Sequence, residues 1–226
     1  SFSAYTKGQK PGDELTREQI EHRMTLLAPR FNWIRSFSTT QGNEYIPQVA
    51  KAMGLNTLVG AWLGENPDKN RNEIEKLIEL AHEGAVDVAA VGNEVLYRSD
   101  LDETELLDFM AEVKERLPST VPMGYVDAYY EFEARPQVTD ACDVLLTNCY
   151  PFWEGCALPY ATLYMQDMYR RVQKVANGKR VIISETGWPS SGGNFYGAES
   201  SLQGAYRYFL KAMEWAAEDD VEMFYF

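Results

Sequence analysis

The sequence alternates between short apolar runs and longer stretches with helical periodicity, and this alternation constrains the fold most. Runs rich in β-branched and aromatic residues predict eight strands, at 2–5, 33–38, 57–63, 86–94, 123–128, 144–150, 180–185 and 221–226. Between them, apolar residues spaced i, i+3, i+4 and i+7 predict seven helices, near 16–27, 45–53, 74–81, 102–117, 131–140, 164–175 and 202–213. Strict alternation of this kind indicates parallel strands joined by helical crossovers.

Eight such units predict an α/β fold of the (β/α)8 TIM barrel type, with residues 1–226 forming a single catalytic domain. An open, doubly wound sheet is the alternative. The glycine fingerprint of a dinucleotide site does not follow the first predicted strand, which disfavours that alternative. The strand at 221–226 has no helix after it, so the last helix of the barrel is missing from the predicted elements. We expect the native gene product to continue beyond Phe226, or a second segment to cover the exposed barrel surface.

Charge and composition exclude several classes of partner. The net charge of −13 disfavours binding to nucleic acid or to an anionic membrane, both of which require basic patches. No stretch approaches the ~20 apolar residues of a membrane span. Three cysteines without a Cys-x-x-Cys pair predict neither a disulfide framework nor a zinc site. We therefore expect a monomer that binds a neutral substrate and needs no metal or cofactor.

The side chains that could carry out catalysis in this sequence are carboxylates. The two histidines, His22 and His82, both fall in predicted helices, which rules out a three-histidine zinc site and disfavours a Ser-His-Asp triad. Glu94 and Glu185 each end a short apolar run, where α/β folds place their chemistry. They are separated by three βα units, which would set them on facing sides of one barrel mouth.

Two carboxylates that flank one bond are what glycosidic cleavage requires: one protonates the leaving oxygen, and the other attacks the anomeric carbon or activates water. We predict that Glu94 and Glu185 form this pair. The alternative for each is a structural role, as a cap of the following helix or as the partner of an arginine such as Arg35.

Side chains near these glutamates are candidates for substrate binding. Asn93 precedes Glu94 and could reach a sugar hydroxyl. Tyr150 closes the neighbouring predicted strand and could hold Glu185 in place and ionised. Trp153 and Trp188 could offer stacking platforms for a sugar. Packing at the rim of the barrel is the alternative for each of them.

Two segments carry a family resemblance. Residues 91–95 (VGNEV) and 183–190 (ISETGWPS) resemble the two signature motifs of glycoside hydrolase family 17, and residues 148–152 (NCYPF) look like the family's Asn-x-Tyr-Pro segment. The resemblance covers essentially the whole chain and is to bacterial or fungal members rather than to plant ones. It implies a (β/α)8 barrel and a retaining β-1,3- or β-1,3-1,4-glucanase, or a related transglycosylase.

The resemblance also implies roles for individual residues. Glu94 would be the acid/base and Glu185 the nucleophile, acting on a laminarin-type polysaccharide or oligosaccharide. The expected substrate-binding residues are Tyr5, Arg35, Phe37, Asn93, Asp127, Tyr150, Trp153 and Trp188. Phe37 stands where the family often has tyrosine, so one hydroxyl contact is not expected. The expected location is secreted, periplasmic or cell-surface.

Three functions remain open at this point: a retaining β-1,3-glucan hydrolase, a glucan transglycosylase with the same residues, and a glucan-binding barrel without catalysis. The presence of both glutamates favours an enzyme. Neither motif distinguishes endo from exo attack.

Overall fold

The computed structural model describes residues 1–226 and divides them into two compact units. Unit 1 comprises residues 1–126 and 141–143, and unit 2 comprises residues 127–140 and 144–226. The sheet holds seven strands, whose order in the sheet is their order in the chain, β1 to β7. The registered strand pairs are parallel, as the alternation of strands and helices predicts.

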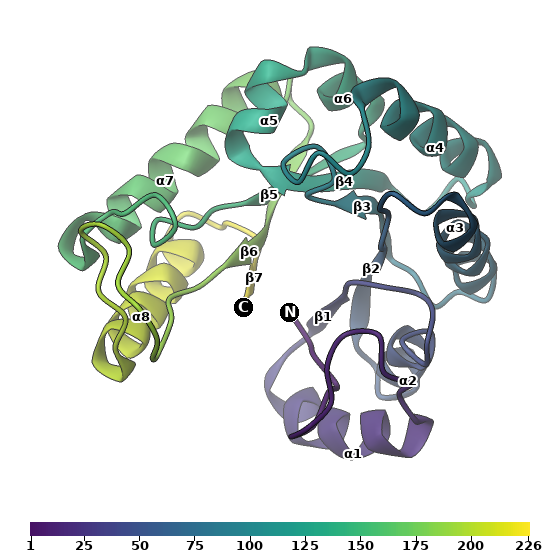
Figure 1. The fold of residues 1–226 in the computed structure, drawn as a ribbon, viewed down its shortest axis with the longest axis horizontal. Coiled ribbons are helices and arrows are strands. Elements are labelled where there is room, and N and C mark those ends of the chain that lie inside the picture. The colour runs from purple at the N-terminus through teal and green to yellow at the C-terminus, as the bar shows by residue number, and fades with distance from the viewer. The chain divides into compact units, whose positions relative to one another are not determined.

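The elements of unit 1 are α1 (Arg17–Leu27), η1 (Ala28–Arg30), β1 (Trp33–Ser36), α2 (Tyr45–Ala52), β2 (Asn56–Ala61), α3 (Pro67–His82), β3 (Val88–Asn93), α4 (Glu103–Arg116) and most of β4 (Met123–Ala128). Helices α1 and α2 pack together beside β1 (Figure 1). They cover a buried cluster that includes Ile20, Met24, Ile34 and Val49.

The elements of unit 2 are α5 (Tyr129–Ala134), α6 (Pro136–Ala141, of which the last residue belongs to unit 1), β5 (Val144–Asn148), α7 (Leu158–Val175), β6 (Arg180–Thr186), α8 (Leu202–Glu218) and β7 (Met223–Tyr225). Helix α7 packs against both α5 and α8 (Figure 1). Strand β7 corresponds to the predicted strand at 221–226.

Strands β3 and β5 are buried along their whole length, which explains why their sequences are continuous apolar runs rather than alternating ones. Such strands are covered on both faces, so their side chains are buried whichever face they point to. The polar residues that do occur come at their carboxyl ends, at Asn93 and at Thr147 and Asn148.

The predicted first strand, at 2–5, does not form, and the count of eight strands is therefore wrong. Phe2 donates its backbone N–H to the carbonyl oxygen of Arg35 at 2.9 Å, and Phe2 and Ala4 are buried as alternate strand residues would be. A turn from Thr6 to Gln9 follows at once, with Gly8 at a φ of 95°. The segment is thus too short to build a repeating ladder.

The single helix predicted at 131–140 is two helices, α5 and α6. The break falls at Arg135, whose φ of −129° and ψ of 77° are not helical. Arg135 precedes Pro136, and the proline ring disfavours the helical region for the residue before it.

The sequence has capping-box patterns at Thr16 with Gln19 and at Asp102 with Glu105, and only the second forms a complete box. Asp102 and Glu105 exchange side-chain and backbone hydrogen bonds at the start of α4. At the start of α1, Thr16 accepts from the backbone of Gln19, but the Gln19 side chain donates instead to the carbonyl oxygen of Ala4 at 2.7 Å. That contact fastens the extended segment at 2–5 to α1.

None of the helices is long and apolar enough to cross a membrane.

Candidate active site

Glu94 lies directly after β3, where the backbone turns sharply. Its φ is 54°, in the left-handed region that non-glycine residues rarely adopt. The pairing of β3 with β4 shifts register between Ala90 and Asn93, and the N–H of Glu94 donates to the carbonyl oxygen of Val126 at 2.7 Å. A left-handed non-glycine residue at the end of a strand is a form of strain that often marks a functional position.

Two arginines bind Asn93, the residue before Glu94, and one of them also binds the carbonyl oxygen of Glu94. Arg35, fully buried in β1, donates to the side-chain oxygen of Asn93 at 2.6 Å. Arg98 donates its guanidinium to the carbonyl oxygen of Asn93 and its backbone N–H to the carbonyl oxygen of Glu94, the latter at 2.9 Å. Asp100 pairs with Arg98 at 2.7 Å, which keeps the guanidinium in place.

Glu185 lies within the last two residues of β6 and is 7% exposed. Each of its carboxylate oxygens accepts a hydrogen bond: Oε2 from the Tyr150 hydroxyl at 2.8 Å and Oε1 from the Asn148 amide at 3.3 Å. The Ser184 hydroxyl in turn donates to the Asn148 side-chain oxygen at 2.8 Å, which fixes the orientation of that amide. The predicted contact between Tyr150 and Glu185 is therefore present.

A register shift aims Glu185 at these donors. Thr147 pairs with Ile183, but the next residue, Asn148, pairs with Glu185 instead of Ser184. A bulge of this kind places an extra residue on one strand and changes the direction of the side chains that follow. The N–H of Cys149 then donates to the carbonyl oxygen of Glu185 at 2.8 Å, which holds the bulge.

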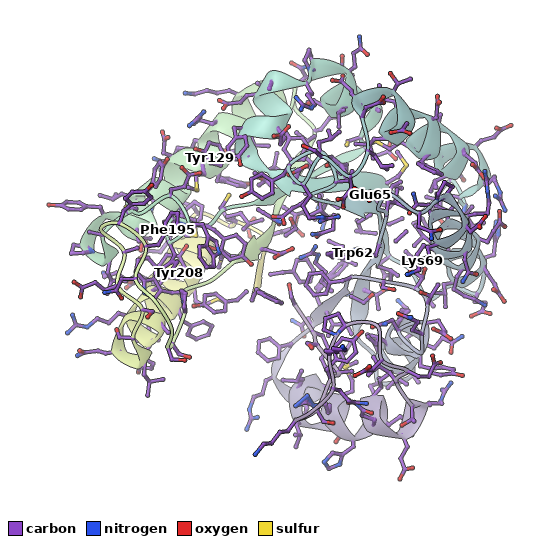
Figure 2. The ribbon with its side chains drawn as sticks, viewed as in Figure 1. Trp62, Glu65, Lys69, Tyr129, Phe195 and Tyr208 are labelled. Atoms are coloured by element: carbon purple, nitrogen blue, oxygen red, sulfur yellow. The ribbon has the colours of Figure 1, made fainter.

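Aromatic rings form a continuous row in unit 2, from the buried Tyr208 to the exposed Tyr196. Neighbouring ring centroids along this row are 4.8 to 5.8 Å apart, in the order Tyr208, Trp188, Phe152, Trp153, Phe195, Tyr196. Phe195 and Tyr208 are labelled in Figure 2. Trp153 is 59% exposed, so a stacking role for its ring stays a prediction that the structure allows.

Trp188 does not offer the open stacking platform that the sequence suggested. It is 6% exposed, its ring packs against Phe152 and Tyr208, and its indole N–H donates to the carbonyl oxygen of Glu199 at 3.0 Å. Gly204 of α8 lies against it, because a Cβ at this position would meet the indole nitrogen at 3.0 Å. Trp188 is a packing residue that supports Phe152.

The remaining predicted residues have mixed surroundings. Phe37 is half-buried and lies under the Arg35 guanidinium, whose carbon is 4.4 Å from the ring centroid. Asp127 is buried in β4 and accepts from the N–H of Ala128 at 2.7 Å. Tyr5 packs against the cluster beneath α1, and its carbonyl oxygen accepts from Arg23. Within unit 1 the structure brings Arg35, Phe37 and Asn93 together; within unit 2 it brings Tyr150 and Glu185 together.

Three residues near these strand ends were not predicted: Trp62, Glu73 and Arg98. Arg98 lies over the ring of Trp62, with its guanidinium carbon 4.6 Å from the ring centroid. Trp62 falls at the carboxyl end of the predicted strand at 57–63, so the position that singled out Trp153 was a signal for Trp62 as well. Nothing in the local sequence indicated Glu73, whose partners are far away along the chain.

Cys149 sits between Asn148 and Tyr150 but is not a reactive group. It is fully buried, and burial raises the pKa of its thiol to about 12. A thiol with this pKa is protonated at neutral pH and is a poor nucleophile.

Comparison with known proteins agrees with this geometry. The family model of the BtgE/BtgC glycoside hydrolase domain matches residues 1–226. The glucan 1,3-beta-glucosidase of Schizosaccharomyces pombe is 27% identical over 219 residues, which are 89% of this chain and 68% of that protein. A probable glucan endo-1,3-beta-glucosidase, btgC of Aspergillus fumigatus, is 33% identical over 199 residues; the match covers 79% of this chain and spans 28% of that longer relative.

Among solved structures, the glycoside hydrolase family 17 beta-1,3-glucanosyltransferase of Rhizomucor miehei aligns with a TM-score of 0.88 at 30% identity. The alignment covers 97% of this chain and 84% of that one. An active-site mutant of the same enzyme has been solved in complex with laminaritriose. The fold is thus an α/β barrel of parallel strands, here with seven strands. The chain belongs to the BtgE/BtgC glycoside hydrolase domain family and to glycoside hydrolase family 17.

Proposed function

We propose that this chain cleaves β-1,3-glucan by a retaining, two-step mechanism in which Glu94 is the acid/base and Glu185 the nucleophile. The observation that carries the proposal is the position of both glutamates: each stands at the carboxyl end of a parallel strand, in a motif of the family. Active sites of such barrels are built at this end of the strands.

The surroundings of Glu185 suit a nucleophile. It must be anionic and must approach the anomeric carbon from one direction. Donors on both carboxylate oxygens, from Tyr150 and Asn148, stabilise the negative charge and restrict rotation of the carboxyl group. In the first step Glu185 bonds to the anomeric carbon while Glu94 gives its proton to the departing glycosidic oxygen. In the second step Glu94 takes a proton from water, which attacks the same carbon and releases Glu185.

Glu94 is half-exposed, unlike Glu185. An acid/base must exchange a proton with both the leaving group and water, so access to solvent suits this role. For a retaining mechanism the two carboxyl groups have to lie ~5–5.5 Å apart during the reaction. We predict this separation for a crystal structure of the protein with a bound oligosaccharide; a separation near ~9 Å would indicate an inverting enzyme instead.

The β-1,3 linkage is supported by the relatives, since the curated proteins and the structural neighbour are named for β-1,3-glucan chemistry. The decisive assay is release of reducing ends from laminarin by the purified protein, with cellulose and xylan as controls for linkage. Equal or faster release from cellulose or xylan would reject the β-1,3 assignment. Binding to laminarin without release of reducing ends would favour a glucan-binding barrel.

A transfer reaction is the second candidate, because the structural neighbour at 30% identity is a glucanosyltransferase. Both reactions share the glycosyl-enzyme intermediate and differ in whether water or a sugar hydroxyl attacks it. Products from a laminarioligosaccharide of defined length separate the two. Transfer yields products longer than the starting sugar, whereas hydrolysis yields only shorter ones.

We also propose a secreted, periplasmic or cell-surface location, because a polymeric glucan is met outside the cell membrane. Fractionation of cells that express the native gene, with immunodetection of the protein in medium, wall and cytosol, tests this. Recovery in the cytosol alone would reject it.

A further inference from the structure

We propose that Trp62 is a sugar-binding platform, which forms a glucosyl subsite on the Glu94 side of the active site. This inference rests on the proposed function for the identity of the sugar, a β-1,3-linked glucosyl unit. The observations that carry it all lie within unit 1 and concern the short connection that follows β2.

Trp62 is exposed although the residues around it are buried. It is 41% exposed, while Ala61 before it and Leu63 after it are both 0% exposed. An indole is among the most costly side chains to leave in water, so the exposed part is a candidate contact surface. Sugars expose C–H faces that stack on aromatic rings, and a partly exposed, oriented indole provides such a face.

One face of the Trp62 ring is already occupied. The guanidinium carbon of Arg98 lies 4.6 Å from its centroid, and Arg98 is fixed by Asp100 and by the carbonyl oxygens of Asn93 and Leu63. The cation on one face strengthens the orientation of the ring. The remaining surface of the ring is therefore presented in one direction instead of rotating freely.

The backbone of this connection is tethered at each successive residue by a buried or anchored side chain. The N–H of Trp62 donates to Glu73 at 3.0 Å, the carbonyl oxygen of Leu63 accepts from Arg98 at 3.3 Å, and Gly64 exchanges two hydrogen bonds with the buried Asn70. Glu73 is 4% exposed, and it also accepts from the hydroxyls of Ser38 and Thr40. An exposed loop residue held this firmly loses little conformational entropy on binding a ligand.

The same tethers connect Trp62 to the position of Glu94. Arg98 touches the Trp62 ring and also donates to the carbonyl oxygen of Asn93, the residue before Glu94. A sugar on Trp62 would therefore belong to the same bound chain as the bond that Glu94 protonates. Glu65 and Lys69, labelled with Trp62 in Figure 2, are exposed in the same connection and in the first turn of α3, and offer polar groups for sugar hydroxyls.

The test measures kcat and KM of the wild type, Trp62→Ala and Trp62→Phe on laminarioligosaccharides of increasing length. For the wild type we expect kcat/KM to rise by a step when an added unit reaches Trp62. In Trp62→Ala this step should fall by about tenfold, the factor expected for loss of one stacking contact, and Trp62→Phe should restore part of it. The change should appear in KM, with kcat on the shortest cleaved sugar unchanged.

Phe31→Ala is the matched control, because Phe31 is an exposed aromatic residue of unit 1 (48%) that lies just before β1, at the amino end of that strand. It should leave the length dependence unchanged. A length dependence of Trp62→Ala equal to that of the wild type would overturn the proposal. So would an equal loss of kcat on every sugar, which is what a purely structural role would produce.

Calorimetric titration separates this inference from the proposed function. If the wild type cleaves no β-1,3-linked oligosaccharide, the proposed function fails; the platform is then judged by the dissociation constants of wild type and Trp62→Ala for β-1,3- and β-1,4-linked glucan oligosaccharides. Weaker binding by Trp62→Ala supports it. Equal binding by the two proteins, or binding by neither, rejects it.

Discussion

The structure fixes the main chain of Glu94 and the carboxylate of Glu185. In unit 1, Arg98 binds the carbonyl groups of Asn93 and Glu94, and Val126 accepts from the N–H of Glu94. In unit 2, Tyr150 and Asn148 bind the carboxylate of Glu185 itself. A fixed main chain keeps the sharp turn after β3 in place, and donors on both oxygens stabilise a group that must stay charged.

The supporting layers also differ. Behind Glu94 lies a charged and polar layer of two arginines, Asp100 and the buried Glu73. The unit that contains Glu185 also contains the row of aromatic rings that includes Phe152 and Trp188. Glu94 itself apart, we expect substitutions in the supporting layer of unit 1 to change stability and substrate length preference, and substitutions beside Glu185 to change the rate of the chemical step.

Glu185→Ala should lower hydrolysis of laminarin by roughly 10⁴-fold or more, because it removes the group proposed to attack the anomeric carbon. Laminarioligosaccharides should still bind, with an affinity within a few-fold of the wild type. Kinetics of reducing-end release together with calorimetric titration measure the two effects. Near-normal turnover by this variant would mean that the nucleophile lies elsewhere.

Glu94→Ala should reduce laminarin hydrolysis by ~10²- to 10⁴-fold, the usual contribution of a general acid. The first step on a β-glucoside with a good leaving group, such as dinitrophenolate, should be much less affected, because that group needs no proton. Added azide should restore turnover by replacing the water that Glu94 activates. An equal loss on both substrates would contradict the acid role and would remove the contrast with Glu185.

These two assignments mark how far the sequence could predict the site. The strand-end rule indicated Glu94 and Glu185, because it depends only on an apolar run followed by a carboxylate, and the structure places both at the ends of β3 and β6. The same rule failed for Trp188, since its burial is caused by Tyr208 and Gly204 of α8, which the local sequence does not reveal. The local sequence did not indicate a role for Glu73, because its partners Ser38 and Trp62 lie in two connections elsewhere in the chain.

The fold shows the same division between local and non-local information. The apolar pattern predicted the seven strands that form, because a buried parallel strand is continuous in sequence. It also predicted a strand at 2–5, where alternate residues are buried but a turn at Thr6 follows too soon for a ladder. The break between α5 and α6 was readable from Pro136, and the prediction overlooked it.

Glu73→Ala should lower the free energy of unfolding by about 3 kcal/mol, because it leaves the buried N–H groups of Thr39 and Trp62 without their acceptor. Glu73→Gln should cost much less: its oxygen can serve both N–H groups while its amide donates to the hydroxyls of Ser38 and Thr40. Glu79→Ala, on the exposed face of the same helix, is the control. Urea denaturation measures all three. A cost for Glu73→Ala as small as that of the control would show that the tether is unimportant.

Tyr150→Phe should lower kcat by about 10- to 100-fold, because a hydrogen bond to a charged group contributes ~1.5–3 kcal/mol. KM and stability should change little, since the ring remains in place. Tyr206→Phe, on an exposed face of α8, is the matched control and should leave kcat, KM and stability unchanged. The split between kcat and KM is the readout, because a disturbed fold would change KM and stability as well. An unchanged kcat would mean that Asn148 alone stabilises the charge.

The smallest expected effect concerns Cys149, whose backbone lies in the Glu185 site while its thiol is fully buried. Burial raises its pKa to about 12, against ~8.5 for an unfolded cysteine, so the folded thiol stays protonated throughout the neutral and mildly alkaline range. Ionisation of Cys149 leaves the free energy of unfolding unchanged below pH ~8.5. That free energy decreases as the pH rises toward 12, because in this range only the unfolded state ionises.

At pH 8 a thiol reagent should modify the partly exposed Cys156 first, leave Cys149 unmodified and leave activity intact. Mass spectrometry of labelled peptides, with a denatured sample as the positive control, tests this. Loss of activity in proportion to labelling of Cys149 would show that solvent reaches the interior of the Glu185 site.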